Sequence, residues 1–274
     1  MDLNSVTAIV RPRARSEFAP PGAGDAILGG GTWLFSEPQP GVRRLIDLTG
    51  LDWPPLEASA SGLSIAATCT VERLYGFELP PDWRAAGLIA ACCRSFLASF
   101  KIWSMATVGG NLCLALPAGP MISLCAALEG TCVIWRAEGG ERRVPAIDFA
   151  RGPLDNALEP GEVLRAIELP VEALRRQAAF RRASLTPLGR SGVLLIGTLA
   201  PDGRFALTVT AATRRPVQLR FEAMPGAGKL ASQLAAAIPD ALYYDDMHGR
   251  PDWRRHMTRE LAEEIRDELA EGAG

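Results

Sequence analysis

The sequence lacks most of the patterns that mark a metal-binding, hydrolytic or nicotinamide-dependent site. Its 274 residues include only two histidines, no Cys-x-x-Cys pair and no run with the cysteine spacing of an iron–sulfur cluster. No Gly-x-Ser-x-Gly is present, and no Gly-x-Gly-x-x-Gly follows a strand pattern, so neither covalent hydrolysis nor a Rossmann nicotinamide site is supported. Any iron–sulfur cluster that serves this protein is therefore expected on another polypeptide.

Long apolar runs and a strong net charge are also missing. No stretch approaches about 18 apolar residues, and residues 1–18 have no signal-peptide core, so we expect a cytoplasmic protein without a membrane span. The formal net charge of −2 gives no electrostatic case for nucleic acid or an anionic membrane. The six cysteines are expected to be buried free thiols, and 48% hydrophobic content suffices for the core of one or two domains.

Two glycine-rich segments are the most informative features that are present. Adjacent glycines allow successive backbone N–H groups to converge on an anion without obstruction by Cβ atoms, although a lone glycine pair is more commonly a tight turn. The candidate residues of the first segment are Ile27, Leu28, Gly29, Gly30, Gly31, Thr32, Trp33 and Leu34, and those of the second are Thr107, Val108, Gly109, Gly110 and Asn111.

The two segments together resemble the two pyrophosphate-binding loops of a known family, the FAD-binding medium subunits of molybdenum hydroxylases of the xanthine dehydrogenase and carbon monoxide dehydrogenase type. The resemblance continues at residues 161–170 and 179–184, and so covers nearly the whole chain. It implies that FAD lies between the glycine loops, that Leu164 packs against it, and that Arg181 places a positive charge near the flavin ring. Arg182 competes for that role, but neighbours on a strand face opposite ways.

The resemblance implies an α+β fold: two FAD-binding subdomains of the vanillyl-alcohol-oxidase (PCMH) type, then a C-terminal three-stranded antiparallel sheet with helices. We expect boundaries at 1–53, 54–170 and 171–274. Apolar periodicity and turn residues predict the elements themselves. The predicted strands are 25–34, 43–48, 63–67, 131–136, 142–147, 163–169, 180–184, 193–199, 205–210 and 217–221, and the predicted helices are 84–97, 120–130, 228–238 and 252–269.

Two residues depart from the family pattern. Trp33 stands where the family often has a small polar residue, and Pro120 stands where its second loop usually ends in Asp. A carboxylate contact to the cofactor is therefore expected to be lost or supplied elsewhere. The polar run 244–249, with His256 nearby, is more typical of turn formation and helix capping than of a metal site, so no metal is assigned to this chain.

The resemblance implies an FAD-binding electron-transfer subunit of a three-component molybdenum hydroxylase. The molybdopterin-type molybdenum cofactor would lie on a large partner subunit and the [2Fe-2S] clusters on an iron–sulfur subunit, with electrons leaving through the flavin to an external acceptor. No acid or base side chain is required for this role, because the redox chemistry belongs to the cofactor. Two alternatives stay open: a stand-alone flavin oxidoreductase, and a flavin-free assembly or interaction protein that retains the fold.

Overall fold

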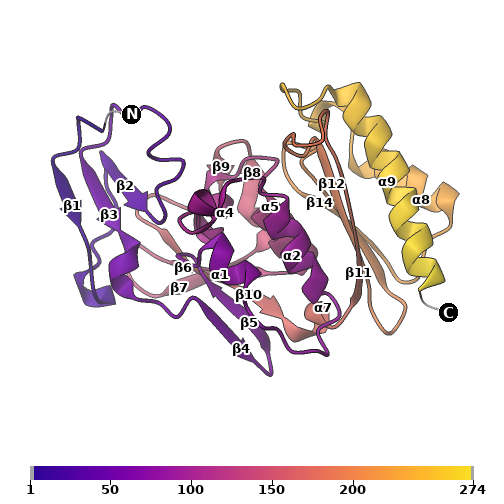
Figure 1. The fold of residues 1–274 in the computed structure, drawn as a ribbon, viewed down its shortest axis with the longest axis horizontal. Helices are drawn as coiled ribbons and strands as arrows, with labels where there is room; N and C mark the ends of the chain where they lie inside the picture. Colours follow the sequence, from indigo (N-terminus) through magenta and orange to yellow (C-terminus); the bar gives the residue numbers. More distant parts are fainter. Residues whose placement is uncertain (1–2, 273–274) are drawn as a thin grey trace.

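The computed structural model describes residues 3–272, and its three larger sheets follow one another along the long axis of the molecule (Figure 1). An N-terminal lobe, a central helix-covered sheet and a C-terminal sheet lie in chain order, with the last helix on the outer face of the C-terminal sheet. Within residues 3–272, no helix combines the length and apolarity that crossing a membrane requires.

The N-terminal sheet is parallel, with the order β1 (Ala8–Val10), β3 (Arg44–Asp47) and β2 (Asp25–Leu28). The predicted strand at 25–34 therefore ends at Leu28, where the glycines begin. Residues 29–43 form turns and a loop instead of a helix. The first glycine segment is thus a strand end that opens into a loop.

The central sheet has the order β4 (Leu56–Ser59), β5 (Gly62–Ala66), β10 (Val163–Pro170), β6 (Thr131–Trp135) and β7 (Glu141–Pro145), and every pairing in it is antiparallel. The predicted strands at 63–67 and 163–169 and the predicted hairpin at 131–147 are confirmed. A core of buried residues joins this sheet to the helices that cover it. Those helices are α1 (Val71–Tyr75), α2 (Ala86–Arg94), α4 (Val108–Leu114), α5 (Pro120–Ala127) and α7 (Val171–Leu174).

The C-terminal sheet is an antiparallel meander of four strands, one more than the family resemblance implied. They are β11 (Gln177–Ala183), β12 (Val193–Leu199), β13 (Phe205–Thr210) and β14 (Val217–Phe221). β11 adds the fourth strand because it pairs with β12 along its full length. Helices α8 (Ala227–Ala237) and α9 (Pro251–Glu271) cover one face, and α5 packs on the other, so β12 and β13 are buried on both sides.

Short elements complete the chain. They are the 3-10 helices Arg15–Glu17, Leu48–Leu51 and Asp240–Leu242, the helices α3 (Phe100–Trp103) and α6 (Ala146–Phe149), and the strand pair β8 (Ala150–Gly152) and β9 (Asp155–Asn156).

Helix α5 connects the central part of the molecule to the C-terminal sheet. The hydroxyls of Ser123 on α5 and Thr210 on β13 share a buried hydrogen bond of 2.6 Å. Near the end of the helix, Gln218 Nε2 on β14 donates to the Ala126 carbonyl at 3.3 Å. Because buried polar groups require partners, these bonds fix the register of the helix on the sheet.

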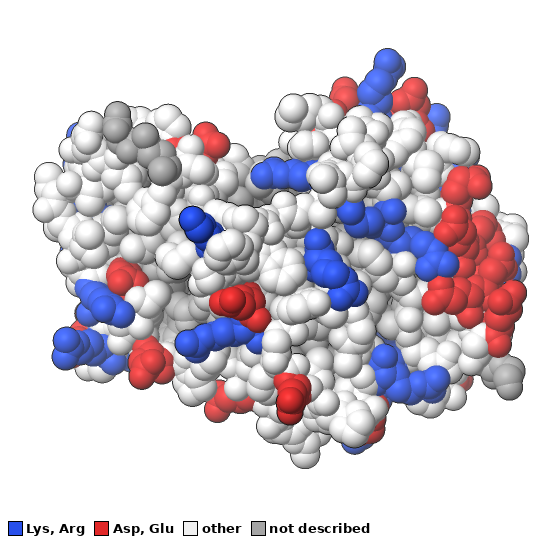
Figure 2. All heavy atoms as spheres, in the orientation of Figure 1, with Lys and Arg blue, Asp and Glu red and all other residues white. Residues whose placement is uncertain are grey.

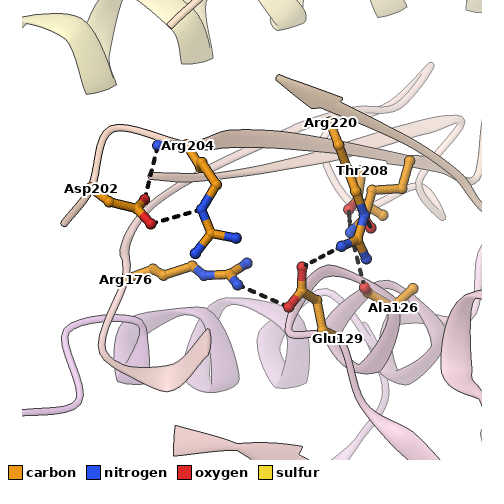
Figure 3. Close-up of polar contacts among 8 residues, drawn as sticks. Ala126, Glu129, Arg176, Asp202, Arg204, Thr208 and Arg220 are labelled. Carbon is orange, nitrogen blue, oxygen red and sulfur yellow. Dashed lines mark hydrogen bonds and ion pairs between the residues drawn. The ribbon is translucent and has the colours of Figure 1, made fainter. Parts of the chain in front are cut away.

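Glu129, which lies just after α5, adds ion pairs to the contact between this part of the chain and the C-terminal sheet (Figure 3). Its carboxylate accepts from Arg176 at 2.8 Å and lies 3.1 Å from a guanidinium nitrogen of Arg220 on β14. Burial alone would raise the pKa of Glu129, but the bond from Arg176 and the charges of both arginines outweigh it and lower that pKa. The carboxylate is therefore ionised and ties the two parts together.

Candidate functional site

The two glycine segments meet at the wall of a cavity of about 620 Å³. The first segment leaves the end of β2, and the second begins helix α4 behind its capping residue Thr107. Of the candidate residues, those that line the cavity are Ile27, Gly29, Gly30, Gly31, Thr32, Trp33, Leu34, Thr107, Gly109, Gly110, Asn111 and Leu164.

Close approach of the two segments explains why glycine occupies the first one. A Cβ atom on Gly30 would lie 1.6 Å from the carbonyl oxygen of Met105, and one on Gly29 would lie 3.0 Å from the Thr107 hydroxyl. Gly31 has a φ of +72°, which other residues rarely adopt. A side chain at Gly30 would collide with backbone and one at Gly31 would be strained by its φ, whereas one at Gly29 would require only a small shift of Thr107.

The backbone donors of the two segments differ. Within residues 3–272, none of the N–H groups of Gly29–Leu34 donates to a protein acceptor, so they are available to a ligand. In the second segment the N–H of Gly109 donates to the Ala67 carbonyl, and that of Gly110 to the Thr107 hydroxyl, each at 3.0 Å. Unused N–H groups are therefore found in the first segment, whereas these two in the second are used within the fold.

Asn111 has a structural bond of its own. Its Oδ1 accepts from the N–H of Met121 at 3.1 Å, which satisfies a free donor in the first turn of α5. Pro120, at the first position of that helix, is buried and lines the cavity. The bond from Met121 to Asn111 thus joins α4 to α5 in the wall of the cavity. Pro120 has no carboxylate that could contact a cofactor.

Apolar side chains form much of the remaining wall. Leu164 on β10 is 2% exposed and lines the cavity, while Trp33, which also lines it, is 38% exposed. Leu28 and Val108 do not line it, and Val108 is wholly buried in the central core. The cavity therefore combines free backbone donors with apolar surface.

Arg181 lies outside this site, which corrects the expectation for it. Its guanidinium contacts Glu264 and Glu268 on α9, both at 2.7 Å, and it does not line the cavity. Figure 2 shows the acidic side chains gathered at the right-hand edge of the molecule, where α9 runs in Figure 1. Arg181 faces outward because α9 packs on that side of β11.

Arg182 points to the other face of β11, toward the turn that joins β11 to β12. Its Nε donates to the Ser191 hydroxyl at 2.9 Å, and its Nη2 donates to the Gly189 carbonyl. From this turn Leu188, Arg190 and Ser191 line the cavity. Sequence reasoning missed them, because an arginine in a turn between two strands indicates by itself only exposure to solvent.

The charged residues among those that line the cavity are Glu162 and Arg190. The Glu162 carboxylate accepts from Arg142 Nε at 2.7 Å and from the N–H of Glu159 at 2.8 Å. The bond from Arg142 lowers the pKa of Glu162 despite its burial, so this group is ionised but already neutralised. Arg190 is exposed, and among the described residues no carboxylate pairs with it.

The polar run at 244–249 serves the fold. The Asp246 carboxylate accepts from the N–H of His248 at 2.8 Å and from the buried guanidinium of Arg254. In the part of the chain that the structure describes, no three His, Cys, Asp or Glu side chains gather as a metal site would require.

A protein-family model described as "FAD binding domain in molybdopterin dehydrogenase" matches residues 17–172. Among curated proteins, the chain is 37% identical over 75 residues to caffeine dehydrogenase subunit beta of a Pseudomonas species, covering 27% of this chain and 25% of that subunit. It is 33% identical over 142 residues to the carbon monoxide dehydrogenase medium chain of Afipia carboxidovorans, covering 51% and 48% of the two chains. The alignments thus span from a quarter to about half of these relatives.

Solved structures match over almost the full length. The fold is similar to a chain of quinoline 2-oxidoreductase from Pseudomonas putida 86, with a TM-score of 0.79 at 21% identity over 100% of this chain and 99% of that one. It is also similar to a chain of carbon monoxide dehydrogenase from Oligotropha carboxidovorans, with a TM-score of 0.78 at 22% identity over 97% of each chain. At this identity the likeness establishes the shared fold.

Proposed function

The chain belongs to the family of FAD-binding domains of molybdopterin dehydrogenases, whose model matches more than half of it, and we propose that it is the electron-transfer subunit of a three-component molybdenum hydroxylase. As a member of that family it is an FAD-binding oxidoreductase subunit. We also propose the direction of electron transfer: electrons arrive from iron–sulfur clusters on a partner and leave to an external acceptor. The cytoplasmic location expected from the sequence is part of the same proposal.

The observation that carries the proposal is the closure of the two glycine segments on one cavity. The pyrophosphate of FAD needs converging N–H donors without Cβ obstruction, and the loop Gly29–Leu34 offers unused donors beside three glycines. A flavin ring needs apolar surface, which Leu164 and Trp33 offer in the same cavity. Its volume of about 620 Å³ lies within the range of roughly 300–1,000 Å³ that is common for ligand sites. The residues present therefore fit the cofactor.

Bound FAD would supply both the electron-accepting and the electron-donating chemistry, and this chain would supply its position and surroundings. We assign the loop Gly29–Leu34 to the pyrophosphate and Leu164 to the packing of the cofactor. The segment at Thr107–Asn111 fixes the opposing wall through its internal bonds. The Glu162–Arg142 pair, whose carboxylate is buried, adds no net charge to the wall.

Partner subunits complete the proposed enzyme. The sequence has no cysteine spacing for an iron–sulfur cluster, and two of its relatives are named as a subunit beta and a medium chain. We place the [2Fe-2S] clusters on an iron–sulfur subunit and the molybdopterin-type cofactor on a large subunit. Within this chain we assign residues 1–53 and 54–170 to FAD binding and residues 171–274 to the C-terminal domain.

Two other functions are less well supported. A stand-alone flavin oxidoreductase would need an acid or base of its own in the cavity, and the carboxylate that lines it, Glu162, is already paired with Arg142. A flavin-free assembly protein would have no need for the unused donors of the first loop.

Reconstitution with FAD and isolation of the complex test the proposal. Acid precipitation of folded, FAD-treated protein is expected to release about one flavin per chain, and release of none would reject FAD binding. The isolated complex is expected to show both flavin and iron–sulfur absorption bands. Rapid turnover of an organic substrate by this chain alone would instead support the stand-alone enzyme.

A further inference from the structure

The turn that joins β11 to β12, residues 184–192, contributes Leu188, Arg190 and Ser191 to the cavity lining. Leu188 is 86% exposed although it also lines the cavity, and its neighbour Leu185 is 57% exposed. Such exposure of leucine is unfavourable in water and is relieved when an apolar ligand lies against it. Arg190 lines the cavity two residues further on.

The base of the turn is held firmly from two sides. Arg182 bonds Ser191 and the carbonyl of Gly189, as described above. The buried Arg254 donates from Nη1 to the carbonyl of Gly192 at 2.9 Å. A Cβ atom on Gly192 would lie 2.5 Å from the Trp253 ring, so the backbone there is closely packed. The position of Arg190 at the cavity is therefore set by the fold.

The charge of this turn has no counterpart among residues 3–272. Within residues 3–272, the guanidinium of Arg190 makes neither an ion pair nor a side-chain hydrogen bond. Arg182 contacts a hydroxyl and a carbonyl but no carboxylate, and burial lowers the pKa of Arg182. Positive charge without a carboxylate partner thus lies beside an apolar part of the wall, where it favours a ligand that carries or gains negative charge.

Bound FAD presents two such charges. The pyrophosphate is permanently anionic, and the loop Gly29–Leu34 already offers donors to it. The ring becomes anionic when it accepts two electrons and one proton, because one negative charge then stays uncompensated. Leu188 is apolar and Arg190 is cationic. Together they fit a flat apolar ring that becomes anionic better than they fit a phosphate.

We propose that Arg190 stabilises the negative charge that reduction places on the flavin ring, and so takes the role that the family resemblance implied for Arg181. This inference rests on the proposed function, since it requires FAD in the cavity. Arg182 is the positioning residue, because it holds the turn that carries Arg190.

Redox titration of the FAD-loaded chain, with a chemical reductant and an indicator dye, tests the proposal. Arg190→Gln is expected to reduce the preference for reduced over oxidised flavin tenfold, which for two electrons lowers the midpoint potential by about 30 mV. Arg190→Lys should retain most of the wild-type potential, because it keeps the charge. Arg151→Gln, which changes an exposed arginine outside the cavity, is the matched control and should leave the potential unchanged.

The outcomes separate this inference from the function on which it rests. Wild-type protein that binds no FAD would reject the proposed function. Wild-type protein that binds FAD, with equal potentials in wild type and Arg190→Gln, would overturn the role of Arg190. A loss in Arg190→Lys as large as that in Arg190→Gln would overturn it as well, since charge would then not be the cause.

Discussion

A Cβ atom on Gly30 would lie 1.6 Å from the carbonyl oxygen of Met105. Gly30 belongs to the first glycine segment, and Met105 lies two residues before the second, so the space left by one hydrogen sets how closely the two segments approach. Because the obstacle is backbone, it cannot move aside as a flexible side chain could.

Gly30→Ala is therefore expected to push the two segments apart. We expect a loss of unfolding free energy of about 3 kcal/mol, the upper end of the usual cost of overpacking, and at least tenfold weaker FAD binding. Urea denaturation and flavin fluorescence titration measure the two effects. Gly41→Ala is the matched control, since nothing lies within 4 Å of its Cβ position. Similar behaviour of the two variants would contradict the requirement for close approach.

Arg181 gives a second prediction, opposite to the one from the sequence. Because its guanidinium pairs with Glu264 and Glu268 on α9, Arg181→Gln should leave the flavin potential unchanged. The pairs are partly exposed, so the variant should lose about 0.5–1 kcal/mol of stability. A lowered potential with unchanged stability would restore the original assignment.

Arg181 shows which features of the site the sequence predicts and which it does not. Strand periodicity placed Arg181 and Arg182 on opposite faces correctly, because that follows from local backbone geometry. Which face meets the cavity depends on where α9, some 80 residues later, packs on the sheet. The same limit applied to Arg190, whose place at the cavity is set by bonds of the turn to Arg182 and Arg254.

For the glycine segments too, the sequence predicted some features of the site and not others. Their glycine content predicted that both contact one cofactor, and the structure places most of their residues on the wall of one cavity. The use of their N–H groups was not predictable, because the acceptor for Gly109 is the carbonyl of Ala67, 42 residues earlier in the chain. Most strands and helices with an apolar pattern were predicted to within a few residues, but the strand predicted at 25–34 ends at Leu28, where the glycines begin.

The buried Glu162–Arg142 pair predicts a pH dependence. The pKa of Glu162 lies below its ordinary value of 4.5 in the folded protein. The pair therefore stabilises the fold above the unfolded pKa of about 4.3, and this contribution is lost as the pH falls through the lowered pKa. Arg142→Gln should cost about 3 kcal/mol near neutral pH, because it leaves a buried carboxylate unpaired.

Denaturant titrations across pH test this prediction. The stability difference between wild type and Arg142→Gln should shrink as the pH falls through the lowered pKa of Glu162, where its carboxylate becomes protonated. Arg143→Gln is the control from the same strand, since the Arg143–Glu168 pair is exposed. It should cost at most about 1 kcal/mol. Equal losses in the two variants would show that burial of Glu162 adds nothing to its pair.

The cysteines give the last prediction, which also reports on the cavity. All six are free thiols, and burial raises the pKa of Cys113 and Cys125 to about 12. Because the thiolate is the reactive form, native protein should react with Ellman's reagent slowly, and denatured protein should expose six thiols. Cys113 alone among them lines the cavity within residues 3–272, so it should be the first to react in native protein and should be protected by FAD. Mass spectrometry of the labelled protein identifies the site, and early labelling at Cys132 or Cys92 instead would contradict the core packing described here.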